Sequence, residues 1–376
     1  MAQDFMRVIY SYAAAAMVPW ALLVAGAFFG APFAVLALLA LTLGTALLDT
    51  WMSPPAPSDP PDPNAERVSI LLALAHLTLI PVVLAGLMAG NMGLGGNLAL
   101  FLAAASWLGQ ISHPNAHELI HRPKPGLRWL GAAVYTTMLF GHHVSAHKLV
   151  HHTHVGTEAD PATPRHGESF WSYVPRAWSG GFQAGLEAER EQAVRRGDQP
   201  ELRQTPYPIW VGGAALTCLV VLLAFNFGSL IAFLALCALA HLQILISDYI
   251  QHYGLARLTL PSGRPEPVAA HHSWNAPRGF SSLLMLNAPS HSEHHMHPGR
   301  PFDTLQTTEL QAPRLPYAMP VMAVIACIPA LWFRVMDRRA VKVMSAAQER
   351  LSARYPTQEP GPAETEQDLR SALVGR

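Results

Sequence analysis

Long apolar runs separated by short polar links dominate the pattern of hydrophobic positions along this chain. Six of the runs are long enough to cross, as helices, the roughly 30 Å of hydrocarbon in a bilayer. They cover residues 12–30, 31–49, 68–89, 95–112, 208–225 and 229–250. The first run is too continuous, and too quickly followed by the second, to be a cleaved signal peptide. The pattern therefore predicts an all-α, polytopic membrane protein with about six transmembrane helices.

Two further apolar stretches, residues 127–141 and 317–333, are too short or too interrupted by proline to span a bilayer. We expect them to form interfacial or re-entrant helices packed under the bundle. Residues 53–63 contain six prolines and predict an extended link between the second and third spans. Residues 183–203 are rich in Glu, Arg, Ala and Gln and predict a solvated surface helix.

The chain shows no internal repeat, and we expect a single membrane-embedded domain over residues 1–355. Residues 356–376 are polar and have no hydrophobic period. Such a segment cannot bury enough apolar surface to order itself, so it predicts a disordered C-terminal tail.

Composition agrees with a membrane location, because 51% of the residues are apolar and only 13% are charged. The 25 basic and 25 acidic residues cancel, so no global field would attract a nucleic acid. In the predicted topology the links at 30–32, 90–94 and 226–229 share one side and contain no Lys or Arg. By the positive-inside rule the other side, with both termini, is cytoplasmic. This predicts a multi-pass protein of the inner (cytoplasmic) membrane.

Histidine is the residue in excess, with 19 copies concentrated between positions 113 and 154 and between 271 and 297. Four clusters lie where predicted spans leave the membrane or in the segments that follow. His117 and His121 are four residues apart, so on a helix they share one face and can grip one metal ion. Similar spacings recur in His147–His152 and His291–His295, where we expect one ligand-bearing face each, and His252 follows the sixth span directly.

Nine imidazoles are predicted to bind metal, namely His117, His121, His147, His151, His152, His252, His291, His294 and His295. A lone HxxxH pair is most often a surface or hydrogen-bonded pair, but that reading does not explain four clusters on one membrane face. Nine ligands exceed what one tetrahedral ion can use and suit two ions of iron, copper or zinc with four or five ligands each. A set without carboxylates leaves the ions strongly positive, which favours oxidation over hydrolysis.

Two other classes of protein compete with this prediction. Residues His117 to His121 read HELIH, the HExxH signature of a zinc protease in which Glu118 would be the general base. An intramembrane protease needs only a third ligand, however, and leaves seven clustered histidines unexplained. A protein that merely binds or transports metal predicts ionisable residues inside the spans. Apart from His76 and His241, the spans are almost free of them.

Several stretches of this sequence resemble the integral-membrane alkane hydroxylase (alkane 1-monooxygenase) family. That family includes the membrane subunit of xylene monooxygenase and is related to the membrane fatty-acid desaturases. The matching stretches are LLD at 47–49, HELIHR at 117–122, 147–152, DPA at 160–162, GESFW at 167–171, YIQHYGL at 249–255, HHSWN at 271–275, HSEHH at 291–295 and PALWF at 329–333. The resemblance covers roughly residues 45–340, and the HYGL and HHSWN elements separate this family from the desaturases.

The resemblance implies a six-helix bundle with a cytoplasmic, histidine-rich cap that holds two irons through the nine histidines. O2 would be the co-substrate, and the terminal methyl group of a medium-chain alkane would become a primary alcohol. The chain has no flavin or nucleotide fingerprint and no cysteine cluster. Two electrons per turnover would therefore come from a separate carrier, a rubredoxin or a ferredoxin-type protein served by an NAD(P)H reductase.

Two departures from the family pattern leave the substrate open. Ala146 stands where many alkane hydroxylases carry a glutamate, and Gln251 replaces a glutamate before His252. Both residues look more like the xylene monooxygenase branch, so hydroxylation of a methyl group on an aromatic ring is the alternative reaction. Desaturation of a fatty acid is a more distant one.

Some polar residues near the predicted ligands are expected to orient imidazole N–H groups or to contact the substrate end. The residues are Glu118, Asp160, Asp248, Glu293, His271 and His272. The competing interpretation is ordinary helix capping or surface ion pairing.

Overall fold

Among the residues described by the computed structural model, six helical segments are long and apolar enough to cross a membrane, which confirms the predicted number. They are Val8–Phe29, Ala31–Trp51, Ala65–Ala89, Gly93–Ile120, Tyr207–Ala224 and Phe227–His252. The structure describes residues 2–306 and 312–355, so the predicted tail at 356–376 lies outside the described residues. Within the described part of the chain there are helices and two isolated β-bridges but no strand, which confirms the all-α fold class.

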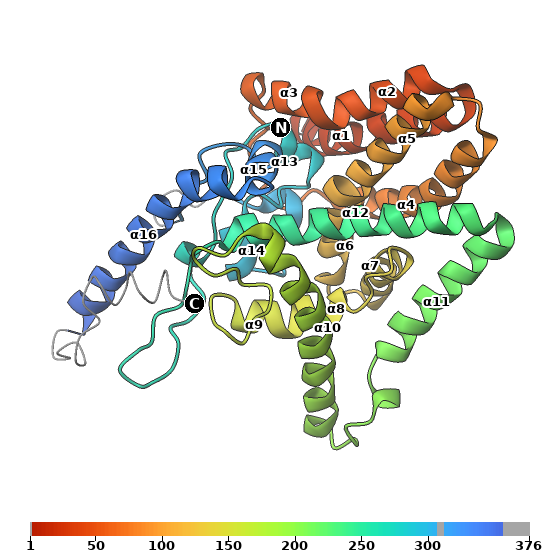
Figure 1. The fold of residues 1–376 in the computed structure, drawn as a ribbon. Helices are drawn as coiled ribbons and strands as arrows, with labels where there is room; N and C mark the ends of the chain where they lie inside the picture. The colour runs from red at the N-terminus through yellow and green to blue at the C-terminus, as the bar shows by residue number, and fades with distance from the viewer. Residues whose placement is uncertain (1, 307–311, 356–376) are drawn as a thin grey trace.

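Two of the spans are built from more than one helix. The elements of the bundle are α1 (Ala2–Phe29), α2 (Ala31–Leu39), the π-helical turn η1 (Ala40–Gly44), α3 (Thr45–Trp51), α4 (Ala65–Ala89), α5 (Gly93–Trp107), the π-helical turn η2 (Leu108–Ser112), α6 (His113–Ile120), α11 (Tyr207–Ala224) and α12 (Phe227–His252). The links α1–α2, α4–α5 and α11–α12 lie together at one end of the bundle, at the right of Figure 1, and helices α9 (His152–His154) and α14 (His291–Met296) lie away from that end.

Small residues allow the spans to approach closely. A Cβ atom added to Gly86 of α4 would lie 2.8 Å from Ala27 of α1, and one added to Gly96 of α5 would lie 2.7 Å from the Ala31 Cβ of α2. Inside a bilayer there is no hydrophobic gain from helix association, so close van der Waals packing across small residues stabilises such contacts. Together with the packing of α1 against α2, these contacts hold the first four spans as one packed unit.

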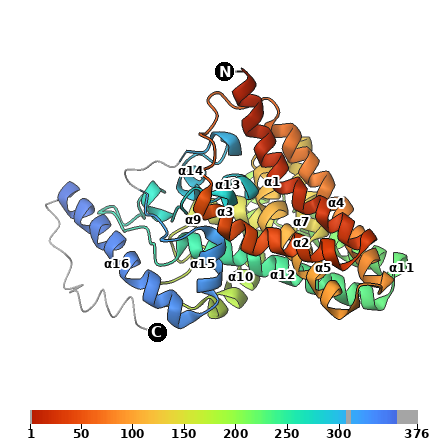
Figure 2. The same cartoon turned by 90° about the horizontal axis from the view of Figure 1, so that it is seen from above.

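The two short apolar stretches form helices, as expected. Residues 127–141 contain most of α7 (Pro125–Thr137), which packs so closely under α6 that a Cβ atom on Gly131 would lie 2.8 Å from the Ala116 carbonyl oxygen. Residues 317–333 contain α15 (Met319–Ala326) and the first turn of α16 (Pro329–Arg354), which are bent by 119° relative to each other. Helix α16 lies on the opposite side of the molecule from α11 (Figure 1, Figure 2).

The surface helix begins earlier in the chain than predicted. Instead of covering 183–203, α10 runs from Phe170 to Arg195. Its start is fixed by Ser169, whose hydroxyl oxygen accepts a hydrogen bond from the Ser172 amide at 3.2 Å. Its end is followed by Gly197 in the left-handed region at φ +86°. The sequence pattern missed the first part because it is aromatic and apolar and packs against α12.

The proline-rich link between the second and third spans is not helical, as predicted. It is tied to the cap by two hydrogen bonds to Asp303. The Ser58 amide donates to the Asp303 carbonyl and the Asp62 amide donates to the Asp303 carboxylate, both at 2.7 Å. The remaining helices are α8 (His143–Ser145), the π-helical turn η3 (Ala146–His151), α13 (Phe280–Leu284) and the short 3-10 helices η4 (Leu202–Gln204), η5 (Ala270–His272) and η6 (Phe302–Thr304).

Candidate metal centre

The nine predicted imidazoles converge into two neighbouring sets where the bundle meets the cap. Within each set, one ring nitrogen per histidine lies within 4.8 Å of all the others. The first set contains His117, His121, His147, His152 and His294. The second set contains His151, His252, His291 and His295. Five and four ligands match the number that the sequence predicts for two ions.

The ends of two spans and three cap elements hold these side chains. His117 lies in the last turn of α6 and His121 caps that helix, so the fourth span delivers both to the first set. His252 is the last residue of α12 and is fully buried. The turn η3 with α9, and the short helix α14, supply the rest. The sites therefore lie at the end of the bundle from which the fourth and sixth spans emerge.

The division of the histidines between the sets differs from the expected shared faces. His147 and His151 are separated, and His147 instead joins His152 in the first set. The physical reason is that residues 146–151 form a π-helical turn, whose hydrogen bonds run from i to i+5. Five residues, rather than four, then separate side chains on the same face.

Helix α14 also serves both sets rather than presenting one ligand face. His291 and His295, four residues apart, belong to the second set, and His294 belongs to the first. On an α-helix, residues i and i+4 project together, while a neighbouring residue turns about 100° away. The helix lies between the sets, so each of its two histidine-bearing faces reaches a different one.

The ring nitrogens within each set face one another at short distances. In the first set the Nε2 atom of His147 lies 2.8 Å from that of His117 and 2.9 Å from that of His152. In the second set the Nε2 atom of His291 lies 2.9 Å from that of His252 and 3.0 Å from that of His295. Neighbouring nitrogens that each lie about 2.0–2.1 Å from one ion have a similar separation.

Two of these nitrogens have no hydrogen-bond partner among the residues that the structure describes. They are the buried Nε2 atoms of His121 and His151, one in each set. A buried polar atom without a partner costs free energy, which a coordinate bond to a metal ion would recover. The donor set therefore fits two ions of a metal that accepts imidazole ligands.

Burial also favours the protonation state that metal binding needs. It lowers the pKa of His147, His294 and His295 well below the ordinary value, with neighbouring histidines as the next cause. Burial likewise lowers the pKa of His152 to about 3. Neutral imidazoles keep one lone pair free, so these side chains are ready to bind a cation at physiological pH.

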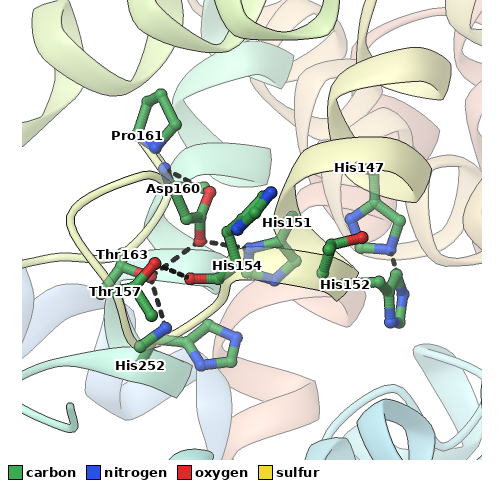
Figure 3. A network of polar contacts seen from close by, with 12 residues as sticks. His147, His151, His152, His154, Thr157, Asp160, Pro161, Thr163 and His252 are labelled. Carbon is green, nitrogen blue, oxygen red and sulfur yellow. Dashed lines mark hydrogen bonds and ion pairs between the residues drawn. The ribbon is translucent and has the colours of Figure 1, made fainter. Parts of the chain in front are cut away.

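Asp160 makes the contact expected of a residue that orients a ligand. Its Oδ2 atom lies 2.8 Å from His151 Nδ1 and accepts a 2.7 Å hydrogen bond from the Thr163 hydroxyl, while its Oδ1 atom accepts one from the Ala162 amide at 2.9 Å (Figure 3). The Nδ1–H group of His151 therefore donates to the carboxylate, and its Nε2 atom is left for a metal ion.

The electrostatics of the buried Asp160–His151 pair also indicate that Asp160 orients His151 as a ligand. Burial alone would lower the pKa of His151, but the charge and hydrogen bond of Asp160 raise it above the ordinary value. Burial alone would raise the pKa of Asp160, but His151 and the other donors hold it below the ordinary value. Asp160 is therefore an anion that makes His151 a more basic ligand.

The two glutamates of the predicted orienting group contact the loop after α14. The Glu118 carboxylate accepts a 3.4 Å hydrogen bond from the Phe302 amide and forms a 3.3 Å ion pair with Arg122. Glu293 forms an ion pair with Arg300. Both glutamates therefore form ion pairs, which the sequence leaves open as the alternative to orienting a ligand. The Glu118 carboxylate points toward the loop.

His272 orients a predicted ligand through its backbone. The His252 Nδ1–H group donates to the His272 carbonyl oxygen at 3.1 Å. The ring of His272 accepts a hydrogen bond from the Ala269 amide at Nδ1, at 2.9 Å, so its proton is on Nε2, which lies 3.0 Å from Glu266 Oε1. His271 Nε2 lies 3.5 Å from the same oxygen. Glu266 was missed because it lies in an irregular loop without any periodic signal.

Comparison with known proteins gives one family and several relatives. Residues 92–323 match the family model for fatty acid desaturases. The chain is 32% identical over 303 residues to an alkane 1-monooxygenase of Ectopseudomonas oleovorans, which covers 76% of this chain and 73% of the relative. It is 30% identical over 315 residues to alkane 1-monooxygenase 1 of Alcanivorax borkumensis, which covers 79% and 75%. The xylene/toluene monooxygenase hydroxylase component of Pseudomonas putida is 27% identical over 245 residues, 63% of each chain.

Proposed function

Because the chain belongs to the fatty acid desaturase family and, within it, to the alkane 1-monooxygenases, we propose that it is a di-iron enzyme that hydroxylates the terminal methyl group of a medium-chain alkane. The observation that carries this proposal is the convergence of nine imidazoles into sets of five and four. The balanced reaction is RH + O2 + 2 e⁻ + 2 H⁺ → ROH + H2O. When bound in the two histidine sets, iron ions would pass the two electrons to O2.

The protein's own part is to hold the ions and to bring an apolar substrate to them. His117 and His252 lie at the ends of their spans, so a substrate that dissolves in the bilayer approaches the sites along the helices. A cavity of about 720 Å³ between α1, the second span and α13 is lined mainly by apolar side chains such as Leu48, Phe280 and Leu283. Its volume lies within the range of small-molecule sites. A cavity whose lining is mainly apolar would hold an alkyl chain by confinement rather than by hydrogen bonds, which favours reaction at the methyl end.

Octane supplied with 18O2 is expected to yield labelled 1-octanol. The measurement is gas chromatography with mass spectrometry of membranes that contain the protein, an NADH-driven reductase and a rubredoxin or ferredoxin. Length preference should be graded, because one methylene is worth only about 1–3 kcal/mol of discrimination. Mainly 2-octanol, an unlabelled alcohol or an alkene would contradict terminal hydroxylation.

The alternative substrate is an alkyl-aromatic such as p-xylene. Two observations favour it. Ala146 and Gln251 differ from the alkane hydroxylase pattern, and the chain is similar to the xylene/toluene monooxygenase component. Octane and p-xylene offered together should separate the two substrate classes. A product that is mainly 4-methylbenzyl alcohol would move the assignment to the aromatic branch.

The proposed partner is a small electron carrier that approaches the cap from the cytoplasm. Arg122 and Arg300 lie together on the cap surface, where an Arg122 Nη atom donates to the Arg300 carbonyl oxygen at 2.8 Å. Both arginines are ion-paired, with Glu118 and Glu293. The neighbouring Arg128, whose guanidinium donates to the Arg122 carbonyl oxygen, would attract an acidic carrier and increase its rate of association. We propose that this face is cytoplasmic and that the chain resides in the inner membrane, since the links free of Lys and Arg lie at the other end.

Glu118→Gln is expected to retain more than half of the hydroxylation activity. The carboxylate contacts Phe302 and Arg122, so the neutral amide can keep the contact with the Phe302 amide and loses only the ion pair. A zinc protease would instead lose its general base and all turnover while it keeps its metal. Complete loss of activity with unchanged metal content would favour the protease. The assay is product formation per chain, with metal analysis of the same sample.

A further inference from the structure

A small cavity lies beside the two histidine sets, between α12, η3 and α10. Its volume is about 30 Å³, whereas one water molecule needs roughly 10–15 Å³ by the same measure. Its polar wall consists of His143, His147, His151, Asp160 and Asp248. A cavity of this size and polarity is suited to hold ordered water, because buried water forms hydrogen bonds to otherwise unsatisfied polar groups.

Asp248 is the carboxyl group in this wall that lacks a protein partner. It lies one helical turn before His252 on α12, and the residue is only 6% exposed. No hydrogen bond joins its carboxyl group to any residue that the structure describes. Both carboxylate oxygens of Asp160, by contrast, are engaged by protein donors. A buried carboxyl without a hydrogen bond is costly unless water reaches it.

His143 presents a second unsatisfied group to the same space. It is 8% exposed, lines the cavity, and its Nε2 atom is buried without a hydrogen-bond partner in the described part of the chain. The His143 ring centroid lies 5.2 Å from that of His147, a member of the first set. The cavity thus connects a free carboxyl group, a free imidazole nitrogen and members of both histidine sets.

We propose that this cavity is a water site and that Asp248 passes through it the protons consumed when O2 is reduced at the histidine sets. The inference rests on the proposed function, in which each turnover takes up two electrons from the carrier protein and two protons. Both protons end in the water that is formed, and the other oxygen atom enters a C–H bond of the substrate. In this step Asp248 would give its carboxyl proton to the ordered water, which would pass it toward the histidine sets, and the carboxylate would take up another proton before the next turnover.

The wall of the cavity on the α10 side leaves space for water. It is made of small residues, Ala177 and the half-buried Gly181. Ala146 of η3, the position at which the sequence departs from many alkane hydroxylases, also lines the cavity. A methyl group there leaves room for water next to His147.

The first test is Asp248→Asn, which keeps the size of the side chain and removes its ability to carry a proton. Product formation should fall by at least about tenfold, because a positioned proton donor typically contributes about 10²–10⁴-fold. Iron content and the amount of protein in the membrane should equal those of the wild type. The matched control is Asp198→Asn, an exposed carboxylate paired with Arg196, which should leave turnover unchanged.

The second test fills the space and leaves Asp248 intact. A Cβ atom on Gly181 would meet only the Ala146 Cβ, at 3.9 Å, so Gly181→Leu can direct its side chain into the cavity. It should reproduce the loss of turnover at unchanged iron content. An electron cryomicroscopy map that resolves ordered solvent should show water between Asp248 and His143 in the wild type and none in Gly181→Leu.

Three results would overturn the proposal: full turnover of Asp248→Asn, full turnover of Gly181→Leu with its side chain in the cavity, or a map without water beside Asp248. The solvent map and the iron content do not depend on the substrate. If wild-type protein hydroxylates neither octane nor p-xylene although water and iron are present, the proposed function fails while the water site stands. The failures of the two proposals are therefore distinguishable.

Discussion

Replacing His294 with alanine is expected to abolish product formation and to lower the iron content from the proposed two ions per chain to one or fewer. The Nε2 atom of His294 lies 3.1 Å from that of His152, and its side chain is the contribution of α14 to the first set. Its removal leaves four imidazoles where the structure brings five together. Metal analysis of purified protein, combined with the octane assay, measures both effects.

His297→Ala is the control for this substitution. His297 lies three residues further along the chain, is exposed, and belongs to neither set. The control should keep both ions and wild-type turnover, which separates loss of a ligand from a general disturbance around α14. A wild-type protein with one zinc and no iron, or full activity in His294→Ala, would contradict the di-iron proposal.

Asp160→Ala is expected to weaken metal binding in the second set by about 10–100-fold, the usual effect of removing a partner that orients a ligand. His151 would lose the acceptor of its Nδ1–H group, at 2.8 Å in the wild type, and its ring could then rotate or change tautomer. The measurement is the iron retained per chain against increasing concentrations of a chelator. Turnover should fall in parallel with the iron.

Two milder variants test whether the effect comes from charge or from geometry. Asp160→Asn keeps an acceptor oxygen but removes the negative charge, so it should give a loss between those of the wild type and Asp160→Ala. Thr163→Val removes one donor to the carboxylate, together with the hydroxyl oxygen that accepts from the Gly156 amide, and should retain most of the iron. If Asp160→Ala retains iron as the wild type does, Asp160 has no orienting role.

The spans could be predicted from the sequence because their signal is local. The third span, for example, was expected at 68–89 and is found at Ala65–Ala89. Length and hydropathy are enough for such a helix, since every backbone group in hydrocarbon must be satisfied within the segment. The first part of α10, from Phe170, was missed because its aromatic and apolar side chains pack against α12. Hydrophobic periodicity carries little information about such contacts.

The composition of the candidate metal centre was also predictable, but its internal arrangement was not. The nine histidines could be chosen because they cluster at the ends of spans and match a family pattern. Their division between two sets depends on the π-helical turn η3. The residues between Ala146 and His151 carry no sequence signal that predicts a π-helical turn. The cavity beside Asp248 arises from tertiary contacts between η3, α10 and α12, and Glu266 acts from an irregular loop that has no periodic signal.

The turn η3 also limits how this centre could be transplanted into a designed scaffold. A designer who copied the histidine spacing onto an ideal α-helical bundle would make His147 and His151 project together, and His152 would turn about 100° away from His151. Neither histidine set would then contain the residues that it contains in this structure. A designed scaffold that reproduces the two sets needs a backbone with an i to i+5 hydrogen-bonded turn at this position. By the same reasoning, deleting one residue such as Lys148 would be more damaging than many substitutions, because it would change which histidines share a site.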